Sequence, residues 1–374
     1  MKKYGVFVTV LALLIVLSLS FTGCAPKAKE YVIGFAGPLT GTSAQDGQAA
    51  LKGLQIAVDQ INKAGGIDGA TVIIDSQDDK SDPTEAATIA NKFAQDKKIL
   101  AVVGNYNSSC TLAASPIFNQ VGLSQIAFGS SSPAVTDAGP FTYRTIPTDD
   151  IGGRYAAKWA FEKYGVQKAA IVYENTDYGV GVAEIYKEEC EAAGIEIVAY
   201  ESYLVGESTD FTTIVTKIKS GDPDVIFIGG LYNETALIAK QAARMDAEYP
   251  IVGVDGIYSP ALIELGGADV EGVTFSAFFS DVNPDPVVQE FVKLYQEANG
   301  EAPSTYAAYA YDAGLCVLEA LKNAGADRTK INDYLTTLSG LNGATGVTTF
   351  DENGDVNRVP SMVAVVGGAF EVID

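Results

Sequence analysis

Residues 31–69 read YVIGFAGPLTGTSAQDGQAALKGLQIAVDQINKAGGIDG, and this stretch indicates how the chain folds. Its opening apolar run ends at Gly37 and Pro38, which is typical of a short buried strand. Apolar residues then recur at helical spacing over residues 45–63, until a glycine-rich turn at 65–69 ends the helix. A strand that leads directly into a helix is the first half of a βαβ unit, so this stretch predicts a parallel sheet covered by helices.

Strands and helices alternate in the same way along most of the remaining chain. We predict strands at residues 72–74, 99–103, 124–128, 169–173, 195–200, 225–228, 251–254 and 272–279. Helices are expected between them at residues 83–96, 112–121, 151–164, 181–193, 211–219 and 234–245. Two later helices and a β-rich end are expected at residues 286–299, 306–324, 347–350, 362–366 and 370–373. The βα pattern runs twice, before and after Pro147, and this repetition predicts two similar lobes.

Residues 1–23 have the composition of a secretory signal peptide. Lys2 and Lys3 precede an apolar run at 6–21, and small residues close the segment. That run is too short and wrongly flanked for a permanent membrane helix, although an N-terminal anchor helix is the alternative interpretation. No later segment approaches the length of a membrane span. The roughly 350 residues that follow suffice for two domains of ordinary size.

Charge and histidine content exclude several classes of function. The net charge is −22, and it becomes more negative still when Lys2 and Lys3 are removed. Such an acidic surface repels nucleic acid, so we expect no nucleic-acid partner. The chain contains no histidine, which rules out Ser-His-Asp and Cys-His nucleophiles and the commonest metal ligand. We therefore expect neither an enzyme, nor a cofactor, nor a metal site.

The acidic turn at 78–83 and the cysteines are expected to be structural. Asp78, Asp79 and Asp82 could suggest calcium, but the run lacks the glycine and terminal glutamate of a calcium loop, so a solvated turn is expected. Beyond position 24 the cysteines are Cys110, Cys190 and Cys316. This odd number allows at most one disulfide, and small buried hydrophobic side chains are the favoured interpretation.

A series of short motifs occurs along the mature chain. They are GPLTG at 37–41, NKAGGIDG at 62–69, DDKSDP at 78–83, GNYNSSCT at 104–111, GSSSP at 129–133, DYG at 177–179, GGLY at 229–232 and FDENGD at 350–355. With this series the chain resembles the branched-chain amino acid binding proteins (the Leu/Ile/Val-binding family) of bacterial ABC importers. The resemblance covers essentially the whole mature chain, and several motifs in one order are more specific than any single motif.

The resemblance implies an α/β architecture, the type I periplasmic-binding-protein fold. Two doubly wound parallel-sheet lobes would be joined by a multi-strand hinge. Lobe 1 would contain residues 31–148 and 280–345, and lobe 2 residues 149–279 and 346–374. The ligand would lie between the lobes at the carboxyl ends of the strands, as is general for open α/β sheets.

The resemblance also implies a lipid anchor and a membrane partner. Residues 21–24, Phe-Thr-Gly-Cys, look like a bacterial lipobox in which Cys24 is acylated after cleavage. Residues 24–30 would then be a tether that holds an extracytoplasmic monomer on the cell membrane. Hinge closure around an amino acid would present the closed protein to the permease subunits of the transporter.

Two serine-rich loops are the candidates for binding the carboxylate of an amino acid. Each loop follows a predicted strand, and the first opens a helix, where backbone N–H groups and the helix dipole favour an anion. By resemblance, Ser108 and Ser131 bind the carboxylate through their hydroxyls, and Ser130 contributes its backbone. The alternative is that these serines only cap helices.

The ammonium group of the ligand calls for an acid and aromatic faces. By resemblance, Asp255, directly after the strand at 251–254, faces the ammonium. Tyr178 and Tyr232 lie in strand-end loops of lobe 2, where their rings could make cation–π contacts and close the cleft. The alternatives are a solvated loop acid and half-buried tyrosines that serve only packing.

The pocket for the ligand side chain departs from the family pattern. Some leucine-binding relatives carry a bulky aromatic residue where this chain has Asp46. We therefore predict a more polar pocket that accepts a polar or even a cationic amino acid, with Tyr106 and Phe278 as further wall candidates. The sequence leaves open which amino acid is bound.

Two other functions remain open at this point. A ligand sensor of the same fold would differ only in its partner, which the sequence does not reveal. An extracytoplasmic hydrolase would need Lys, Asp or Glu as its base, and no Ser-x-x-Lys motif supplies one.

Overall fold

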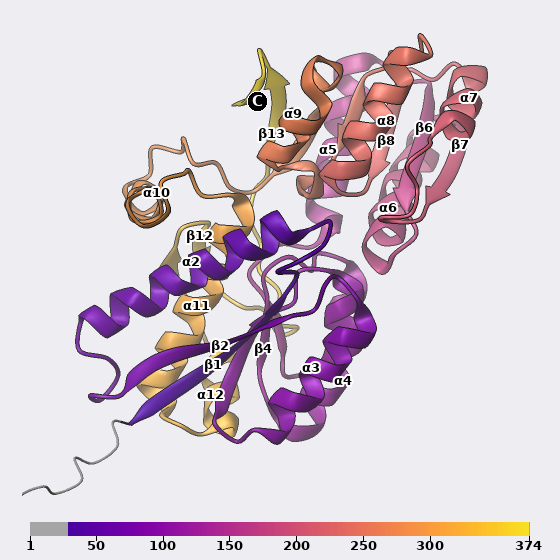
Figure 1. The fold of residues 1–374 in the computed structure, drawn as a ribbon. Helices are drawn as coiled ribbons and strands as arrows, with labels where there is room; N and C mark the ends of the chain where they lie inside the picture. Colours follow the sequence, from indigo (N-terminus) through magenta and orange to yellow (C-terminus); the bar gives the residue numbers. More distant parts are fainter. Residues whose placement is uncertain (1–28, 374) are drawn as a thin grey trace, which may run out of the picture.

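The computed structural model describes residues 29–373, which form two α/β lobes, one above the other in Figure 1. The signal peptide predicted over 1–23, the acylated Cys24 and most of the 24–30 tether lie outside the described residues. None of the helices between residues 29 and 373 combines the length and the apolar character needed to cross a bilayer.

Lobe 1 is built on a five-stranded sheet in which all the strand pairs are parallel. In spatial order its strands are β2 (Thr71–Asp78), β1 (Glu30–Gly37), β3 (Ile99–Gly104), β4 (Gln125–Ala127) and β5 (Thr142–Arg144). The connecting helices are α2 (Ala44–Lys63), α3 (Pro83–Gln95) and α4 (Ser108–Val121). Every residue of β3 is buried because helices cover both faces of this sheet, as is typical of parallel sheets.

Lobe 2 is built on a seven-stranded mixed sheet. Its strands, in spatial order, are β14 (Ala369–Val372), β13 (Ser361–Val366), β10 (Thr274–Ala277), β9 (Ile251–Gly253), β8 (Val225–Gly229), β6 (Lys168–Glu174) and β7 (Glu196–Tyr203). The helices of lobe 2 are α5 (Asp149–Tyr164), α6 (Asp177–Ala193), α7 (Thr212–Gly221), α8 (Tyr232–Arg244) and α9 (Pro260–Gly266). Short 3-10 helices are η1 (Pro133–Val135) in lobe 1, and η2 (Asp255–Ile257) and η3 (Gly267–Val270) in lobe 2. Only the pairings of β13 are antiparallel, so the predicted hairpin-like end is present.

Late helices return to lobe 1. They are α10 (Pro286–Asn299), α11 (Thr305–Ala324) and α12 (Arg328–Leu335). Helix α11 is buried along most of its length and packs along α2, which crosses the middle of Figure 1. A Cβ atom at Gly53 of α2 would lie 2.0 Å from the carbonyl oxygen of Ala307, so this close approach requires glycine.

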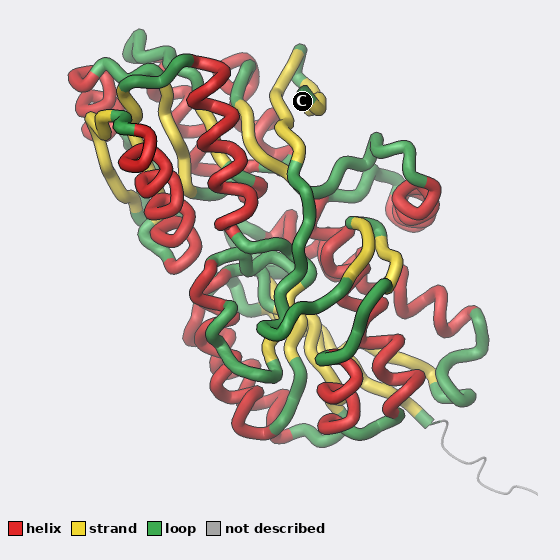
Figure 2. Tube along the Cα trace, turned by 180° about the vertical axis from the view of Figure 1, so that it is seen from behind, coloured by secondary structure: helices red, strands yellow, loops and turns green. Residues whose placement is uncertain are grey.

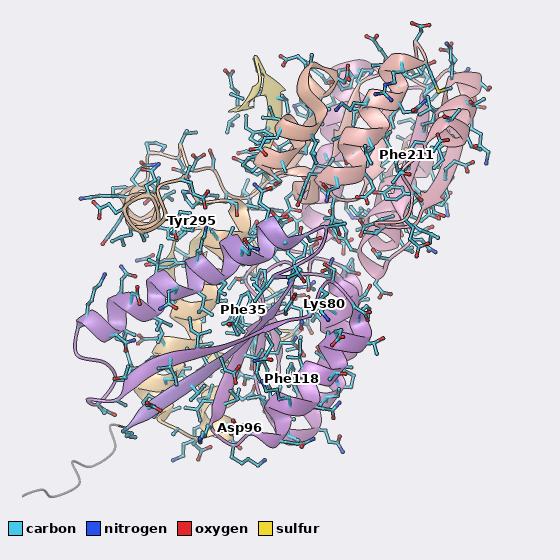
Figure 3. All side chains as sticks on the ribbon, viewed as in Figure 1. Phe35, Lys80, Asp96, Phe118, Phe211 and Tyr295 are labelled. Atoms are coloured by element: carbon cyan, nitrogen blue, oxygen red, sulfur yellow. The ribbon has the colours of Figure 1, made fainter. Side chains whose placement is uncertain are left out.

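Each lobe has its own large buried side chains (Figure 3). Phe35 and Phe118 lie within lobe 1, and Phe211 lies in lobe 2 beside Tyr203. The three cysteines beyond position 24 are buried free thiols, as expected of small hydrophobic side chains. The acidic turn is structural, because Asp82 caps α3 and Asp78 accepts a hydrogen bond from the backbone N–H of Leu39 at 2.8 Å. The expectation of a solvated turn is wrong for Asp79, which is buried and accepts a hydrogen bond from Asn105 Nδ2 inside lobe 1.

The chain crosses between the lobes after β5, after β10 and before β13 (Figure 2). The predicted division at 345/346 falls inside a hairpin, because β11 (Leu341–Gly343) pairs with β12 (Gly346–Thr348). The next segment also contacts lobe 1, since Asp355 forms an ion pair with the buried Arg144. A boundary near residue 360 would keep these contacts within lobe 1, and the exact bounds of the two lobes remain a prediction.

Candidate functional site

A small cavity lies between the lobes at the carboxyl ends of the parallel strands. Its space of about 250 Å³ is partly open to solvent. Lobe 1 and α11 supply most of its wall, and Tyr178 and Leu231 come from lobe 2. Its lining residues are Tyr106, Asn107, Ser108, Gly129, Ser131, Tyr178, Leu231 and Tyr306. The fold therefore brings together four of the predicted site residues, Tyr106, Ser108, Ser131 and Tyr178, around one space.

The lobe 1 wall of this cavity carries hydrogen-bond donors beside one buried acceptor, Asn107 Oδ1, that has no partner among the described residues. Helix α4 begins at Ser108, and its N-cap residue Asn107 makes no side-chain bond to the helix, so the first N–H groups of α4 are not capped. Ser108 Oγ accepts a hydrogen bond from the Ser132 N–H at 3.2 Å, which ties the two serine loops together. Hydroxyls beside the positive end of a helix suit an anion such as a carboxylate.

A buried hydrogen-bond network fixes the positions of both serine loops. Ser130 Oγ lies 2.6 Å from Thr111 Oγ1 and donates to the carbonyl of Asn105, so the Ser130 hydroxyl is already used within the protein. Below it, Asn105 Nδ2 donates to Asp79 Oδ2 at 2.7 Å, and Gln125 Nε2 donates to Asn105 Oδ1 at 2.9 Å. Burial raises the pKa of Asp79 to about 6, partly offset by the Asn105 hydrogen bond.

Two buried acids lie next to residues that line this cavity without lining it themselves, and each has one carboxyl oxygen without a partner among the described residues. Asp255 begins η2 directly after β9, is buried, and has no hydrogen-bond partner for Oδ2 among the described residues. Burial raises its pKa to about 7. The Tyr178 hydroxyl, which also lacks a partner there, packs on the backbone next to Asp255, since a Cβ at Gly256 would lie 2.2 Å from it. Unpaired acceptors at this depth suit a cationic group.

Asp149 is a second acid at this point, and the sequence analysis did not single it out. It begins α5, is buried, and its Oδ2 has no partner in the described part of the chain. Burial raises its pKa well above the ordinary value, and the nearby charge of Asp255 raises it further. Its backbone N–H donates to the Ser131 carbonyl at 2.9 Å, which places it beside the second serine loop. The only sequence signal was an acid directly after the first crossing between lobes.

Two predicted site residues lie elsewhere. Tyr232 does not line the cavity, because its hydroxyl donates to the carbonyl of Thr42 at 3.0 Å and joins the two lobes. Its neighbour Leu231 lines the cavity instead. Phe278 lies in a separate groove at the hinge, next to Phe279 and the β12 strand. The lobes also meet where the Asp177 N–H donates to Ser109 Oγ at 3.3 Å, so the site is in a closed arrangement.

Asp46 lies behind the aromatic wall of the cavity. Tyr106 packs edge-on against Tyr306, with ring centroids 4.7 Å apart, and its hydroxyl donates to Asp46 Oδ2 at 2.9 Å. Asp46 is only 1% exposed, and burial raises its pKa to about 7. Sequence reasoning missed the roles of Leu231 and Tyr306 in this wall, because their contribution depends on how lobe 2 and α11 pack against lobe 1.

Comparisons with known proteins agree with this geometry. A family model described as periplasmic binding protein matches residues 30–369. The Leu/Ile/Val-binding protein homolog 1 of Brucella melitensis is 33% identical, and the match covers 89% of each chain. A leucine-, isoleucine-, valine-, threonine- and alanine-binding protein of Pseudomonas aeruginosa is 30% identical, with 90% of each chain covered.

Solved structures show the same architecture. A leucine binding protein, LivK, from Thermotoga maritima superposes with a TM-score of 0.87 at 30% identity, covering 92% of this chain and 98% of that one. The branched-chain amino acid transporter substrate binding protein LivJ from Streptococcus pneumoniae, in complex with isoleucine, gives 0.86 at 32% identity, covering 92% and 99%. The predicted fold class is therefore confirmed.

Proposed function

Because this chain belongs to the periplasmic binding protein family, we propose that it is the extracytoplasmic substrate-binding component of an ABC importer for amino acids. The relatives are named for binding leucine, isoleucine and valine, and the LivJ structure holds isoleucine. We extend to this chain the shared part of those ligands, the α-amino acid head group.

One observation carries the proposal: the two sides of the site have opposite chemistry. Ser108 and Ser131 lie by the uncapped start of α4, which suits a carboxylate. Asp255, in lobe 2, has a buried carboxyl oxygen without a partner among the described residues, which suits an ammonium group. A zwitterion satisfies both sides at once, and it does so only when the lobes are closed, since Asp255 belongs to lobe 2. Ligand binding would therefore favour the closed form.

A calorimetric and thermal-shift screen of the twenty amino acids tests this proposal. A ligand that binds only the folded protein raises its stability by RT ln(1 + [L]/Kd), so Tm should rise with ligand concentration while the amino acid is recovered unchanged. Ser108→Ala should weaken binding of every ligand about tenfold, because it removes a hydrogen bond to a charged group. Ser220→Ala, an exposed serine on α7, is the matched control. Absence of any binding by the wild-type protein would refute the amino-acid proposal.

We also propose that Cys24 carries the lipid that anchors an otherwise monomeric protein to the outer face of the cell membrane. The lipobox-like residues 21–24 and the following polar segment support this proposal. Metabolic labelling with a radioactive fatty acid should mark the wild-type protein, whereas Cys24→Ala should lose the label and leave the membrane fraction. Cys190→Ala, a buried thiol far from the N-terminus, should keep the label.

A further inference from the structure

Asp46 is a buried carboxyl group, and the described residues supply a hydrogen-bond donor to only one of its two oxygens. It lies in the first turn of α2, but Ser43 is the N-cap and α2 has no side-chain cap. Its Oδ2 accepts the Tyr106 hydroxyl, whereas Oδ1 has no hydrogen-bond partner within residues 29–373. A carboxyl oxygen buried without a donor is costly, and such groups in native proteins call for an explanation.

No basic side chain is available to neutralise Asp46. It lines a groove of about 910 Å³, part of it open to solvent, that runs along α2 toward α10 and the start of α9. Among the described residues lining this groove, Lys52 is the single base, and its ammonium lies 2.7 Å from Glu301 at the exposed rim. The other charged group there is the acid Asp281. No cation among the described residues of the groove therefore pairs with Asp46, and Oδ1 is left for a donor that comes from outside the chain.

Asp46 also stands between the central cavity and this groove. Tyr106 lines the cavity and holds Oδ2 from that side, whereas Asp46 itself lines the groove. A ligand whose head group binds at Ser108 and Asp255 would direct its side chain along Tyr106 toward Asp46. An aliphatic side chain would leave Oδ1 without a donor, but a side chain that ends in N–H or O–H would supply one.

We propose that the ligand is an amino acid whose side chain ends in a hydrogen-bond donor, and that Asp46 is the residue that selects it. This inference rests on the proposed function, since it takes the amino-acid head group as given. A site that is built to bind a donor discriminates against ligands without one, because its buried acceptor is then left unpaired. The donor-bearing class therefore includes amide and cationic side chains and excludes leucine, isoleucine and valine as the preferred ligands.

Calorimetry on the purified protein with L-glutamine, L-lysine, L-arginine, L-leucine and L-isoleucine tests this assignment. At least one donor-bearing amino acid should bind about tenfold or more tightly than leucine. Asp46→Leu should weaken that ligand by a similar factor and improve leucine. Asp46→Asn has nearly the same shape, so it guards against a folding defect, and it should selectively weaken a lysine or arginine ligand.

The outcomes separate the two proposals. Ser108→Ala should weaken donor-bearing and aliphatic ligands equally, because it affects the common head group. Suppose that leucine binds most tightly, that Ser108→Ala weakens leucine binding, and that Asp46→Leu leaves the order of ligand affinities unchanged. In that case the inference about Asp46 fails, but the proposed amino-acid binding function stands. If no amino acid binds the wild-type protein, both fail.

Discussion

The two sides of the central site differ in how well their polar groups are satisfied. In lobe 1, the groups beneath the serine loops are fully engaged: Asn105 bonds to Asp79 and Gln125, and Gln125 also accepts from Ser115 Oγ at 2.8 Å. On the acidic side, Asp255 and Asp149 each keep an oxygen without a partner among the described residues. The first side is pre-organised by the protein, whereas the second is completed only by a ligand.

This contrast explains why the lobes would close when ligand is bound and open again when it is absent. A satisfied network holds the anion site in place whether or not ligand is present, so that side costs little reorganisation on binding. The unsatisfied acids make the empty closed form unfavourable, because buried carboxylates without partners are costly. Closure is then coupled to the arrival of the ligand's ammonium group.

The largest expected effect comes from Asp255→Asn. Removing the charge should weaken amino-acid binding about 100-fold or more, since a buried charge pair loses one partner. The ligand-free protein should become as stable as the wild type or more stable, because a costly carboxylate is gone. Calorimetry and thermal melting of the same samples measure both effects, with the exposed Asp269→Asn as the control. A large loss of ligand-free stability would contradict the contrast between the two sides.

Gln125→Leu probes the satisfied side. The change leaves Asn105 Oδ1 without its partner, so the free energy of unfolding should fall by about 1–3 kcal/mol, whereas the Ser115 hydroxyl still donates to the Thr111 carbonyl. Urea denaturation measures this loss, and the exposed Gln296→Leu in α10 is the matched control. Equal stability of the two variants would mean that the network does not hold the serine loops.

The stability of the ligand-free protein and its affinity for the ligand should change in opposite directions with pH. The pKa values of Asp255 and Asp46 are raised to about 7, so both groups take up protons in the folded state between pH 4 and 7. The stability that they contribute is present below their unfolded pKa values and is lost as the pH rises through about 7. Ligand affinity should instead fall about 10- to 100-fold from pH 7.5 to 5, because a protonated Asp255 no longer attracts an ammonium.

Melting temperatures of the ligand-free protein and calorimetric Kd values at the two pH values test this pair of trends. Asp255→Asn should remove most of the pH dependence of binding. A wild-type affinity that rises as the solution is acidified would show that the acids do not face the ligand's ammonium.

The smallest effect is expected for Tyr232→Phe. The variant loses the hydrogen bond to the Thr42 carbonyl that links the closed lobes, so the closed form should become less populated and Kd should rise roughly two- to tenfold. Stopped-flow dissociation should show the change mainly as faster release. Tyr334→Phe on α12, remote from the cleft, should leave both constants unchanged. An unaltered Kd for Tyr232→Phe would mean that other contacts between the lobes stabilise the closed form.

Much of the fold was predictable from the sequence alone. The alternation of apolar runs with helical periods predicted the βα order, and the repetition around Pro147 predicted a second sheet. The same pattern placed a strand at 347–350, which overlaps β12, but it missed β11, because a three-residue strand before a tight turn carries little apolar signal. The sequence pattern also gave no sign that Arg144 holds the Asp351–Asp355 turn on lobe 1. The hydrogen bond responsible joins Arg144 to Asp355, which is 211 positions away in the chain.

The candidate site divides in the same way. Ser108, Ser131, Tyr178 and Asp255 were identifiable because each follows a predicted strand, and parallel strands bring their carboxyl ends to one edge. Tyr232 and Leu231 are adjacent in the sequence, and only the entry into α8 decides which side chain enters the cavity and which reaches Thr42. Asp149 and Tyr306 join the site from a crossing segment and from a late helix, so local pattern contained no signal of their proximity.

The sequence by itself determined the types of secondary structure, the order of the lobes and the chemical character of the binding loops, because these depend on local periodicity and residue type. Only the tertiary structure decided which polar atoms are satisfied. Whether a buried carboxyl such as Asp46 or Asp255 finds a donor depends on the packing of segments that are distant in the chain, and that packing leaves these acids open to a ligand.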